Sequence, residues 1–568
     1  MIEKMTKYSF ILLSGDKQQF LQDLQGLGVM DISRSEKPVD DHSAELLGKI
    51  DAKKQEIRDI NRGEDAHLSK LLSGLDALRK EEAEAEVWGN YDPAALATFN
   101  PHFYSTAAKK YNNSWEESYA IQKVLEEGGK VWFVLLGDNS GFPLKEMEAP
   151  ARNLSVIKTD LEEAEKEVNS YRKVLESCKE NIPALEEELG GLTAELNLYL
   201  AGETGEKAAE NSLVIYEGFA PTENTESIKP ALDEMAVYYF AEDACVEDRP
   251  PIKLRNNRFV KMFEVLTDMY GRPAYNGFDP TPFIAIFFLL FFAMCIGDAG
   301  YGLILVIVGL LLRKVKSFSN LAPLVVSLGI GTVVVGFFFH TFFSIDFSNA
   351  AWLQDGLKKI MVPATVAGYD GTMVLALAVG IVHLLLAMIV KTIYATKNKG
   401  FLNSLSTWGW TVFWVGLAVV LLFSLAGVIE KTATKTIIII LGIVCAIGIF
   451  PLNNIHRNPL INIGSGLWDT YNMATGILGD VLSYLRLYAL GLAGAMLGFA
   501  FNDLAAMALG DGGWRWIPFV LIVVIGHTLN IAMAALGAFV HPLRLNFLEF
   551  FKNSDYSADG VKYKPLKK

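Results

Sequence analysis

The chain has 568 residues, of which 51% are hydrophobic and 20% are charged, and its formal net charge is −13. The acidic surplus argues against a nucleic-acid partner, because phosphate binding needs a basic surface. The four cysteines lie far apart and match no metal-binding or disulfide spacing, and we expect neither a metal nor a cofactor. Most charges lie in residues 1–280 and long apolar runs follow. This predicts a cytoplasmic domain over 1–280 and a membrane domain over 281–568.

The first domain begins with a predicted strand–helix–strand unit over residues 8–13, 17–27 and 29–33. The apolar run at 8–13 is too short for a secretory signal, so we expect this half to stay in the cytosol. Residues 44–90 form a charged segment in which leucines recur at steps of three and four, as on the buried face of a helix. Further strands are predicted at 131–136, 213–217 and 237–240.

A longer helical seam runs from Leu154 to Tyr199, with apolar residues at alternating steps of three and four. Such heptads are typical of a coiled coil, and Pro183 would kink it. Two long helices flanked by strands predict an antiparallel coiled-coil hairpin with small α/β lobes at its ends. A hairpin of this kind acts as a strut. Phosphate-loop, HExxH, GxSxG and CxxC motifs are absent, so we expect no catalytic residues.

The second domain contains eight apolar runs, which predict about eight helical membrane spans. They cover residues 283–296, 299–312, 321–343, 372–390, 405–427, 436–452, 473–501 and 517–551. Eight spans put both termini on one side, and the distribution of lysine and arginine makes that side the cytoplasm. The inner set is Arg313, Lys314, Lys316, Lys391, Lys397, Lys399, Arg457, Lys552, Lys562, Lys564, Lys567 and Lys568. The outer set is Lys358, Lys359, Lys431, Lys435 and Arg515.

Arg486 lies near the middle of the apolar stretch 480–498. An arginine at mid-membrane costs about 2.5–3.5 kcal/mol on insertion scales, and it stays protonated at any relevant pH. Such a residue is rarely structural, and it indicates an ion pathway or a counter-charge. Small residues follow it and would let another helix approach closely. They are Ala489, Gly491, Ala493, Gly494, Ala495 and Gly498.

Polar residues elsewhere in the spans are further candidates for a functional site. The last span carries a polar or small stripe made of His527, Asn530, Ala534, Gly537, His541 and Arg544. Asp298 lies between two apolar runs, and His383 is inside the fourth. For three of these residues a purely structural role is the alternative to a functional one. Arg544 could extend to the membrane interface, His383 could be a hydrogen-bonded packing residue, and Asp298 could cap the helix that starts at Ala299.

Several motifs resemble the membrane stator subunit of V/A-type rotary ATPases, called subunit a, or subunit I in bacteria and archaea. The most specific is Ser483-Tyr-Leu-Arg-Leu-Tyr-Ala-Leu-Gly-Leu-Ala493. Others follow in the family's order and include Pro251-Ile-Lys-Leu-Arg-Asn-Asn257, Asp279-Pro-Thr-Pro-Phe283, Gly297-Asp-Ala-Gly-Tyr-Gly302 and His541-Pro-Leu-Arg-Leu545. Gly494 and Ala534 depart from the pattern, because eukaryotic members carry polar side chains there.

The resemblance implies a cytoplasmic strut that links peripheral stalk subunits to a membrane domain beside a rotating proteolipid ring, with the central-stalk adaptor nearby. H⁺ or Na⁺ would enter by one half-channel, ride on the carboxylates of the ring and leave by another, coupled to ATP hydrolysis or synthesis. Arg486 matches the family's essential arginine, and Arg544 its partner. Candidates for lining the half-channels are Ser483, Asp298, His383, His527, Asn530 and His541. The implied location is a prokaryotic cell membrane.

A fixed guanidinium favours a nearby carboxylate as an anion. Arg486 would therefore force a ring carboxylate to release its ion, and it would block leakage between the half-channels. Two other hypotheses stay open. A secondary transporter with a cytoplasmic regulatory domain would have inverted repeats, and the sequence shows no clear duplication. A membrane tether without transport would explain the coiled coil but not Arg486.

Overall fold

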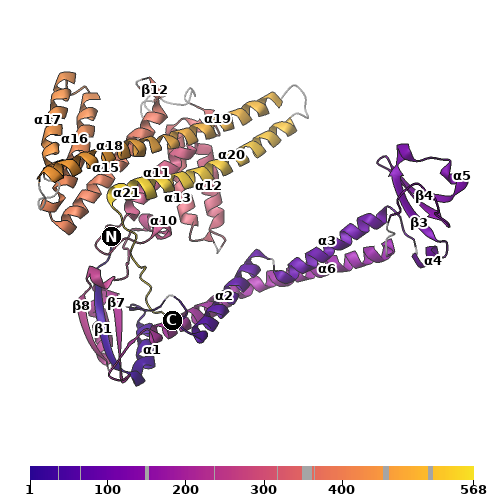
Figure 1. Ribbon diagram of the computed structural model, residues 1–568, viewed down its shortest axis with the longest axis horizontal. Coiled ribbons are helices and arrows are strands. Elements are labelled where there is room, and N and C mark those ends of the chain that lie inside the picture. Colours follow the sequence, from indigo (N-terminus) through magenta and orange to yellow (C-terminus); the bar gives the residue numbers. More distant parts are fainter. Residues whose placement is uncertain are drawn as a thin grey trace. The chain divides into compact units, whose positions relative to one another are not determined.

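The structure is a computed structural model (Figure 1). It describes the chain except residues 36, 64, 92, 148–151, 236, 316–317, 348–360, 364, 367, 426, 452–458, 509–515 and 568. Some of the charged residues that supported the predicted orientation lie outside the described residues. They are Lys316, Lys358, Lys359, Arg457, Arg515 and Lys568.

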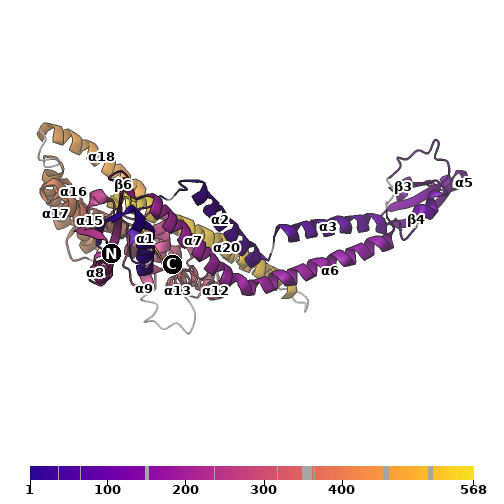
Figure 2. The ribbon, with the colours of Figure 1, turned by 90° about the horizontal axis from the view of Figure 1, so that it is seen from below.

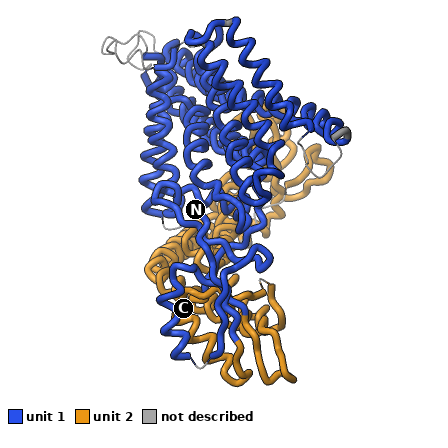
Figure 3. Tube along the Cα trace, turned by 90° about the vertical axis from the view of Figure 1, so that its left-hand side faces the viewer, with its two compact units in different colours: residues 1–10, 217–565 blue, residues 11–216, 566–568 orange. Residues whose placement is uncertain are grey.

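The chain divides into two compact units (Figure 3). Unit 1 comprises residues 1–10 and 217–565, and unit 2 comprises residues 11–216 and 566–568. The described residues are mostly helical with a few small sheets, which confirms the predicted fold class. The functional boundary at residue 280 stays a prediction, because the two units are defined by packing alone.

Unit 2 is built on a long helical hairpin (Figures 1 and 2). Helix α2 (Asp41–Arg62) packs against α7 (Ile182–Glu203), and α3 (Ala66–Glu86) packs against α6 (Leu154–Cys178). The chain runs out along α2 and α3 and returns along α6 and α7, so the two arms are antiparallel. The predicted coiled-coil hairpin is therefore confirmed.

Apolar side chains from both arms hold the helical hairpin together. Leu68 of α3 and Val168 and Leu175 of α6 are buried in one cluster. Full burial of a side chain of this kind contributes about 1.5–3 kcal/mol. The seam is interrupted by a 3₁₀ turn, Lys179–Asn181, and Pro183 lies in the first turn of α7, where its missing N–H is tolerated. The kink predicted at Pro183 is thus a break between two helices.

Aspartates cap the two helices of the outgoing arm, and each is bonded to a tyrosine of the returning arm. Asp40 caps α2 by accepting a hydrogen bond from the Ser43 backbone N–H at 2.8 Å, and it also accepts one from the Tyr199 hydroxyl. Asp65 caps α3 and accepts a hydrogen bond from the Tyr171 hydroxyl at 2.5 Å. The hydroxyl of Tyr199 and the N–H of Ser43 lower the pKa of the Asp40 carboxyl to about 2. Each cap therefore joins the start of a helix in the outgoing arm to a tyrosine of the returning arm.

Two small sheets accompany the helical hairpin. An antiparallel sheet has the order β3 (Pro101–Ala107), β5 (Lys130–Leu136), β4 (Ala120–Glu127), with Phe103 opposite Val134. A second sheet has the order β2 (Asp31–Ile32), β7 (Leu213–Pro221), β1 (Met5–Leu13), β8 (Tyr238–Asp243), and β6 (Glu206–Ala208) pairs with β7. The boundary between the units falls within β1 and β7. Each strand predicted from the sequence overlaps one of these strands, although the prediction at 29–33 is longer than β2 and the prediction at 237–240 begins one residue before β8.

Unit 1 contains the apolar helices. They are α11 (Thr281–Ile296), α12 (Ala299–Leu312), α13 (Ala322–Phe338), α15 (Gly371–Lys399), α16 (Leu405–Leu425), α17 (Lys431–Ile449), α18 (Pro459–Ser483), α19 (Leu485–Ala508) and α20 (Trp516–Arg544). A π-helical stretch, Leu545–Phe550, and α21 (Phe551–Ser554) follow α20. Shorter elements of the chain are α1 (Lys17–Leu27), α4 (Pro93–Ala97), α5 (Trp115–Ser118), α8 (Thr225–Glu234), α9 (Arg258–Lys261), α10 (Glu264–Tyr270), β9 (Thr341–Phe342), β10 (Ile345–Asp346), β11 (Thr365–Val366) and β12 (Tyr369–Asp370).

Each predicted apolar run falls on one or two of these helices. Among the described residues, five helical stretches are long and apolar enough to cross a membrane, and α11, α12 and α13 are shorter. The protein is therefore confirmed as helical and capable of spanning a membrane, whereas the count of eight spans stays a prediction. The seventh run differs most from its prediction. Its helix begins at Pro459 and is interrupted at Tyr484, so that α18 and α19 together cover 459–508.

The centre of unit 1 is α11, which packs against α13, α19 and α20. Its phenylalanines share a buried cluster with Tyr484 and Phe550. Helices α12 and α13 approach each other through glycines, since a Cβ on Gly302 would lie 2.6 Å from the backbone nitrogen of Val333. The same packing places the start of α12 beside α19 and α20, where the polar residues gather.

Candidate functional site

Arg486 is the second residue of α19, next to the interruption at Tyr484. Its side chain is half-buried, and its Nη1 atom is buried without a hydrogen-bond partner among the described residues. A buried cationic donor without a partner is costly. The Nη1 atom of Arg486 is therefore a candidate to bind a group that the described residues do not supply.

The small residues that follow Arg486 divide between two faces of α19. Ala489 and Ala493, one and two turns after Arg486, are exposed on its own face. Gly491 and Gly498 face the protein itself, since a Cβ on Gly491 would lie 3.0 Å from a carbonyl oxygen and one on Gly498 would lie 2.0 Å from a side-chain oxygen. The expectation of one small-residue surface is thus corrected. The glycines admit neighbours from this chain, whereas Ala489 and Ala493 are exposed.

Two of the predicted residues on α20, His527 and Asn530, take part in a buried polar network with Tyr301 of α12 and Asn502 of α19. Tyr301 Oη lies 2.7 Å from His527 Nδ1 and accepts a hydrogen bond from Asn530 Nδ2 at 2.8 Å. On the other side of the ring, His527 Nε2 lies 3.0 Å from Asn502 Oδ1. We call these four residues the α12–α20 network.

The hydrogen bonds of the α12–α20 network have a defined direction. Asn502 Nδ2 donates to the carbonyl of Phe343 at 2.9 Å, so its Oδ1 atom faces His527 as an acceptor. A neutral His527 then carries its proton on Nε2 and accepts from the Tyr301 hydroxyl at Nδ1. Within this network His527 and the Tyr301 hydroxyl can accept and donate a proton, whereas the amides of Asn502 and Asn530 can only orient them by hydrogen bonds or coordinate a passing cation.

Asp298 lies beside this network but is fully occupied by backbone. Its carboxylate accepts hydrogen bonds from the N–H groups of Gly300 (2.8 Å) and Tyr301 (3.1 Å) at the start of α12. It also accepts from Phe343 (2.9 Å) and Ser344 (2.6 Å) in the turn after β9. The capping role, one of the two readings left open by the sequence, is what the structure shows. The side chain is 4% exposed, so its bonds are shielded from water.

His383 is deep in the core of unit 1 and fully buried. Its Nδ1 atom lies 2.9 Å from the hydroxyl of Tyr484, and its ring stacks on Phe550 with centroids 4.8 Å apart. Tyr484 in turn packs against Gly380, where a Cβ would lie 2.3 Å from the ring. These contacts hold the interruption between α18 and α19 in place. The structure therefore puts His383 apart from the α12–α20 network, next to the residue that precedes Arg486.

A second polar cluster combines the end of α18, which precedes Arg486, with the π-helical stretch and α21. Glu549, in the π-helical stretch, is 5% exposed, and its Oε2 atom is buried without a hydrogen-bond partner among the described residues. The predicted residue Ser483 lies within hydrogen-bonding reach of it. Asp480 accepts hydrogen bonds from Asn553 Nδ2 (2.8 Å) and Lys552 Nζ (3.3 Å). We call Asp480, Ser483, Glu549, Lys552 and Asn553 the π-helix cluster.

His541 and Arg544 close the predicted stripe of α20. His541 is half-buried and interacts electrostatically with both Arg486 and Arg544, so all three lie in one neighbourhood. Arg544 itself is exposed at the end of α20. The stripe is therefore not uniform. His527 and Asn530 are buried, whereas Arg544 faces outward, as Ala489 and Ala493 do on α19.

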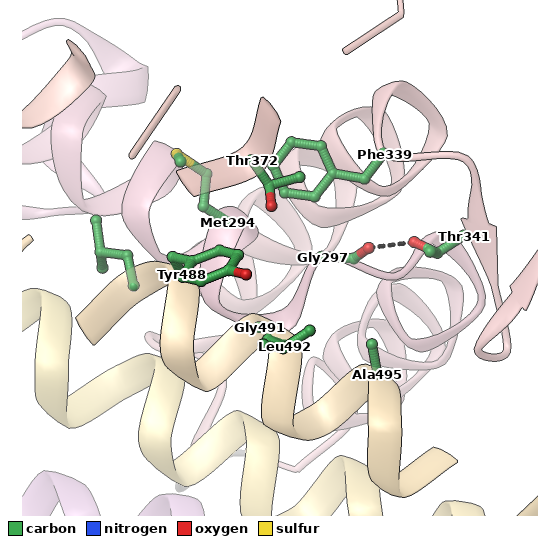
Figure 4. A pocket seen from close by; sticks show the side chains of 10 residues that line it. Met294, Gly297, Phe339, Thr341, Thr372, Tyr488, Gly491, Leu492 and Ala495 are labelled. Carbon is green, nitrogen blue, oxygen red and sulfur yellow. Dashed lines mark hydrogen bonds between the residues drawn. The ribbon is translucent and has the colours of Figure 1, made fainter. Parts of the chain in front are cut away.

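A small cavity lies behind α19, close to Arg486 in the chain (Figure 4). Its volume is about 120 Å³, and Tyr488, Gly491 and Ala495 of α19 face Met294 of α11 across it. The hydroxyl of Thr341 also lines it but donates to the carbonyl of Gly297. Because its lining is mostly apolar, this cavity does not extend the α12–α20 network. Among the described residues no group of three or more metal-ligating side chains gathers that could hold a metal ion.

Sequence reasoning missed Tyr301, Asn502, Glu549 and Tyr484. A signal existed for Glu549, which is an acidic residue within the last predicted span and meets the same criterion as Arg486. No comparable signal existed for Tyr301, because its partner His527 is 226 residues away. A tyrosine in an apolar helix is ordinary until its partner is known.

The fold and these polar groups define a class, namely a helical membrane protein with two polar clusters and an arginine whose Nη1 atom has no hydrogen-bond partner among the described residues. Residues 140–321 match the V-type ATPase 116kDa subunit family. The chain is 29% identical over 460 residues to the A-type ATP synthase subunit I of Methanocaldococcus jannaschii, with 74% of this chain and 64% of that protein covered. It is 32% identical over 331 residues to the protein of the same name from Pyrococcus abyssi, covering 56% and 47%.

The V-type ATP synthase subunit I 1 of Treponema pallidum is 25% identical, and the alignment covers 100% of both chains. The chain thus spans between about half and two thirds of the length of the archaeal relatives, and the whole of the treponemal one. These matches support the resemblance to subunit I of V/A-type ATPases that the motifs indicated. With its five membrane-capable helical stretches it is a membrane protein.

Proposed function

We propose that the chain is the membrane stator subunit of a V/A-type rotary ATPase and carries H⁺ or Na⁺ past a rotating ring of carboxylate-bearing subunits. The observation that carries the proposal is Arg486, a half-buried guanidinium whose Nη1 atom has no hydrogen-bond partner among the described residues and whose face of α19 exposes Ala489 and Ala493. A carboxylate on a neighbouring ring helix would satisfy this donor, and Ala489 and Ala493 would let that helix pass closely.

In this proposal the α12–α20 network forms one half-channel. It reaches α19 at Gly494, whose carbonyl accepts from Asn530 at 2.8 Å, and at Asn502. These positions lie eight and sixteen residues after Arg486, or about 12 and 24 Å along a helix. A relay that begins near one helix end and stops short of Arg486 suits a channel that opens to one side only.

The π-helix cluster would form the other half-channel. Glu549 supplies a buried carboxylate whose Oε2 atom has no hydrogen-bond partner among the described residues, and this carboxylate would take up an ion from the ring. The π-helical stretch that carries it supports this role, because π-bulges occur frequently at functional sites. Lys552 and Asp480 would link this cluster to the surface at the end of α20. His383 and Tyr484 would act by positioning, since they fix the interruption beside Arg486.

Arg486 would keep the two half-channels apart. A ring carboxylate facing lipid must be neutral, with a proton or a cation bound. Beside a fixed guanidinium the ring carboxylate is favoured as an anion. It therefore releases its ion to one polar cluster first and binds a new ion from the other cluster afterwards. Arg544, which is exposed at the end of α20, would extend this positive barrier, since His541 interacts electrostatically with both arginines.

The rest of the chain would hold this site still against the turning ring. The helical hairpin would be a cytoplasmic strut that receives peripheral stalk subunits, with the central-stalk adaptor nearby and both termini in the cytoplasm. The paired caps at Asp40 and Asp65 support a stiff hairpin, because they bond each arm to the other. The chain would contribute no catalytic residue to ATP chemistry.

The proposal is tested by Glu549→Gln in the purified complex reconstituted into liposomes. We expect ATP-driven ion transport to fall tenfold or more, because an amide neither binds nor releases a proton, while Glu549→Asp retains part of the rate. Glu430→Gln, which changes an exposed glutamate at the start of α17, serves as the matched control. Transport by Glu549→Gln at the wild-type rate would contradict the assigned exit path. Purification of the chain without other ATPase subunits would favour a secondary transporter instead.

A further inference from the structure

A long groove in unit 1 lies between α15, α16 and α18, and it meets the π-helix cluster only at Lys552 and Asn553, which line its polar end. One part of it is a cavity of about 520 Å³ with an almost wholly apolar lining, in the size range of small-molecule sites. A second cavity, of about 420 Å³, is lined by polar and charged side chains. Both are bounded by the same three helices, and Met388 lines both.

The polar cavity lies at the same end of all three helices, and the apolar cavity follows it in space. On α16 the polar cavity takes residues 406–411 and the apolar cavity 414–422. On α18 the order is 469–473 and then 477–481, and on antiparallel α15 it is reversed. The groove is therefore amphipathic, polar at one end and apolar at the other.

The length of this groove matches one leaflet of a bilayer. From Ser406 to Leu422 it follows α16 over about 24 Å. A leaflet including its headgroups is about 20–22 Å thick. The polar end carries Lys391 and Lys552, on the side predicted to face the cytoplasm. The groove thus has the dimensions and polarity of a single lipid molecule.

Charge and hydrogen bonding at the polar end favour a phosphate. The lining holds two lysines and Asp469, and because Asp480 neutralises Lys552, Lys391 is the lysine left to bind an anion. Lys552 is already bonded to Asp480, whereas Lys391 has no hydrogen-bond or ion-pair partner among the described residues. Basic pockets between membrane helices on the cytoplasmic side recognise anionic lipid headgroups.

A further unsatisfied donor lies at the junction of the two cavities. Trp414 is the first residue of α16 that lines the apolar cavity, one turn after the polar residues end at Thr411. Its indole Nε1 atom is buried and has no acceptor among the described residues. In a glycerophospholipid the ester carbonyl lies between the phosphate and the acyl chain. It would therefore meet the Trp414 N–H when the phosphate is at Lys391.

We propose that this groove binds one anionic glycerophospholipid, with its phosphate at Lys391, an ester carbonyl at Trp414 and an acyl chain along α16. The site goes beyond the proposed ion transport and does not depend on it. The bound lipid would fill the space between α16 and α18 and so connect the α16–α17 pair to the helix that leads into Arg486.

The test is native mass spectrometry of the full chain, purified in its complex and equilibrated in mixed micelles of phosphatidylglycerol and phosphatidylcholine. We expect the wild type to retain one phosphatidylglycerol in preference to phosphatidylcholine. Lys391→Gln should lower this retention about fivefold, the effect of one lysine at an anionic membrane surface. Trp414→Phe should weaken retention of both lipids and leave their ratio unchanged. Ala418→Trp should abolish retention by filling the apolar cavity, which Ala418 lines.

Two matched controls separate the groove from general effects. Lys397→Gln removes an exposed lysine from the same helix, and Trp408→Phe removes an indole whose N–H is already bonded to Thr396 at 2.9 Å. Both should retain lipid as the wild type does. Equal retention of the two lipids by the wild type would overturn the proposal, as would equal losses in Lys391→Gln and Lys397→Gln. A complex that retains no lipid, with the groove covered by another polypeptide, would overturn it as well.

Discussion

Replacing Asp298 by alanine tests whether this carboxylate fastens the turn after β9 to the start of α12. It accepts hydrogen bonds from the N–H groups of Gly300, Tyr301, Phe343 and Ser344. Loss of the helix cap costs about 1 kcal/mol. The two N–H groups of the turn would stay buried without an acceptor, at about 1–3 kcal/mol each. We therefore expect a destabilisation of about 3–7 kcal/mol from the cap and the turn together.

The turn has little stability of its own. Phe343 and Ser344 have φ values of 50° and 58°, in the left-handed region, which costs about 1–2 kcal/mol for each non-glycine residue. Without Asp298 the turn should therefore relax. The measurement is thermal unfolding of the purified complex in detergent, together with hydrogen exchange of residues 340–346. Asp298→Ala should lower the unfolding temperature and speed exchange in that segment.

Asp298→Asn separates the capping role from an ionic one. Its amide oxygen can keep the three bonds now made by Oδ1 and loses only the bond from Ser344 to Oδ2. We expect an intermediate loss of about 1–3 kcal/mol. If Asp298→Asn unfolded like the wild type and yet abolished ion transport, Asp298 would act on the ion through its charge, and the argument from capping would be wrong.

Two further predictions concern packing and pH. Gly380→Ala should lower the free energy of unfolding by about 1–3 kcal/mol, because its Cβ would lie 2.3 Å from the ring of Tyr484. The control Gly479→Ala, whose Cβ would have no atom within 4 Å, should unfold like the wild type. Equal unfolding temperatures of the two variants would refute this packing. Tyr199→Phe should raise the pKa of Asp40 from about 2 toward its usual value. The depressed pKa gives α2 stability that is present above about pH 4 and lost as the pH falls to about 2. Pepsin should therefore cut α2 at a higher pH in Tyr199→Phe, and an unchanged pH profile would count against the link.

Periodicity predicted the elements whose stability is local. The seam from Leu154 to Tyr199 predicted that this segment is helical and that it packs against the other arm of the hairpin, because heptad spacing specifies a packing face. The strands were found with errors of a few residues at their ends. The interruption at Tyr484 was missed, because it arises from the contacts of Tyr484 with Gly380 and His383, which lie far from it in sequence.

The part of the candidate site that could be predicted from the sequence is the residue whose charge is unusual in an apolar helix. Arg486 stands out because a charge in an apolar helix is costly by itself. The division of the small residues into inward glycines and outward alanines could not be predicted, since it depends on which face of α19 meets Met294 and Ser344. The bonds of Tyr301 likewise exist only because α12 packs beside α20.

The most direct test of the account is ATP-driven ion transport by the complex with Arg486→Gln, reconstituted into liposomes. Arg313→Gln, which removes an exposed arginine at the end of α12, is the matched control. The account predicts that both variants assemble with the ring, that Arg313→Gln transports ions like the wild type and that Arg486→Gln does not transport them. Wild-type transport by an assembled Arg486→Gln complex would contradict the central claim that this arginine separates the two half-channels.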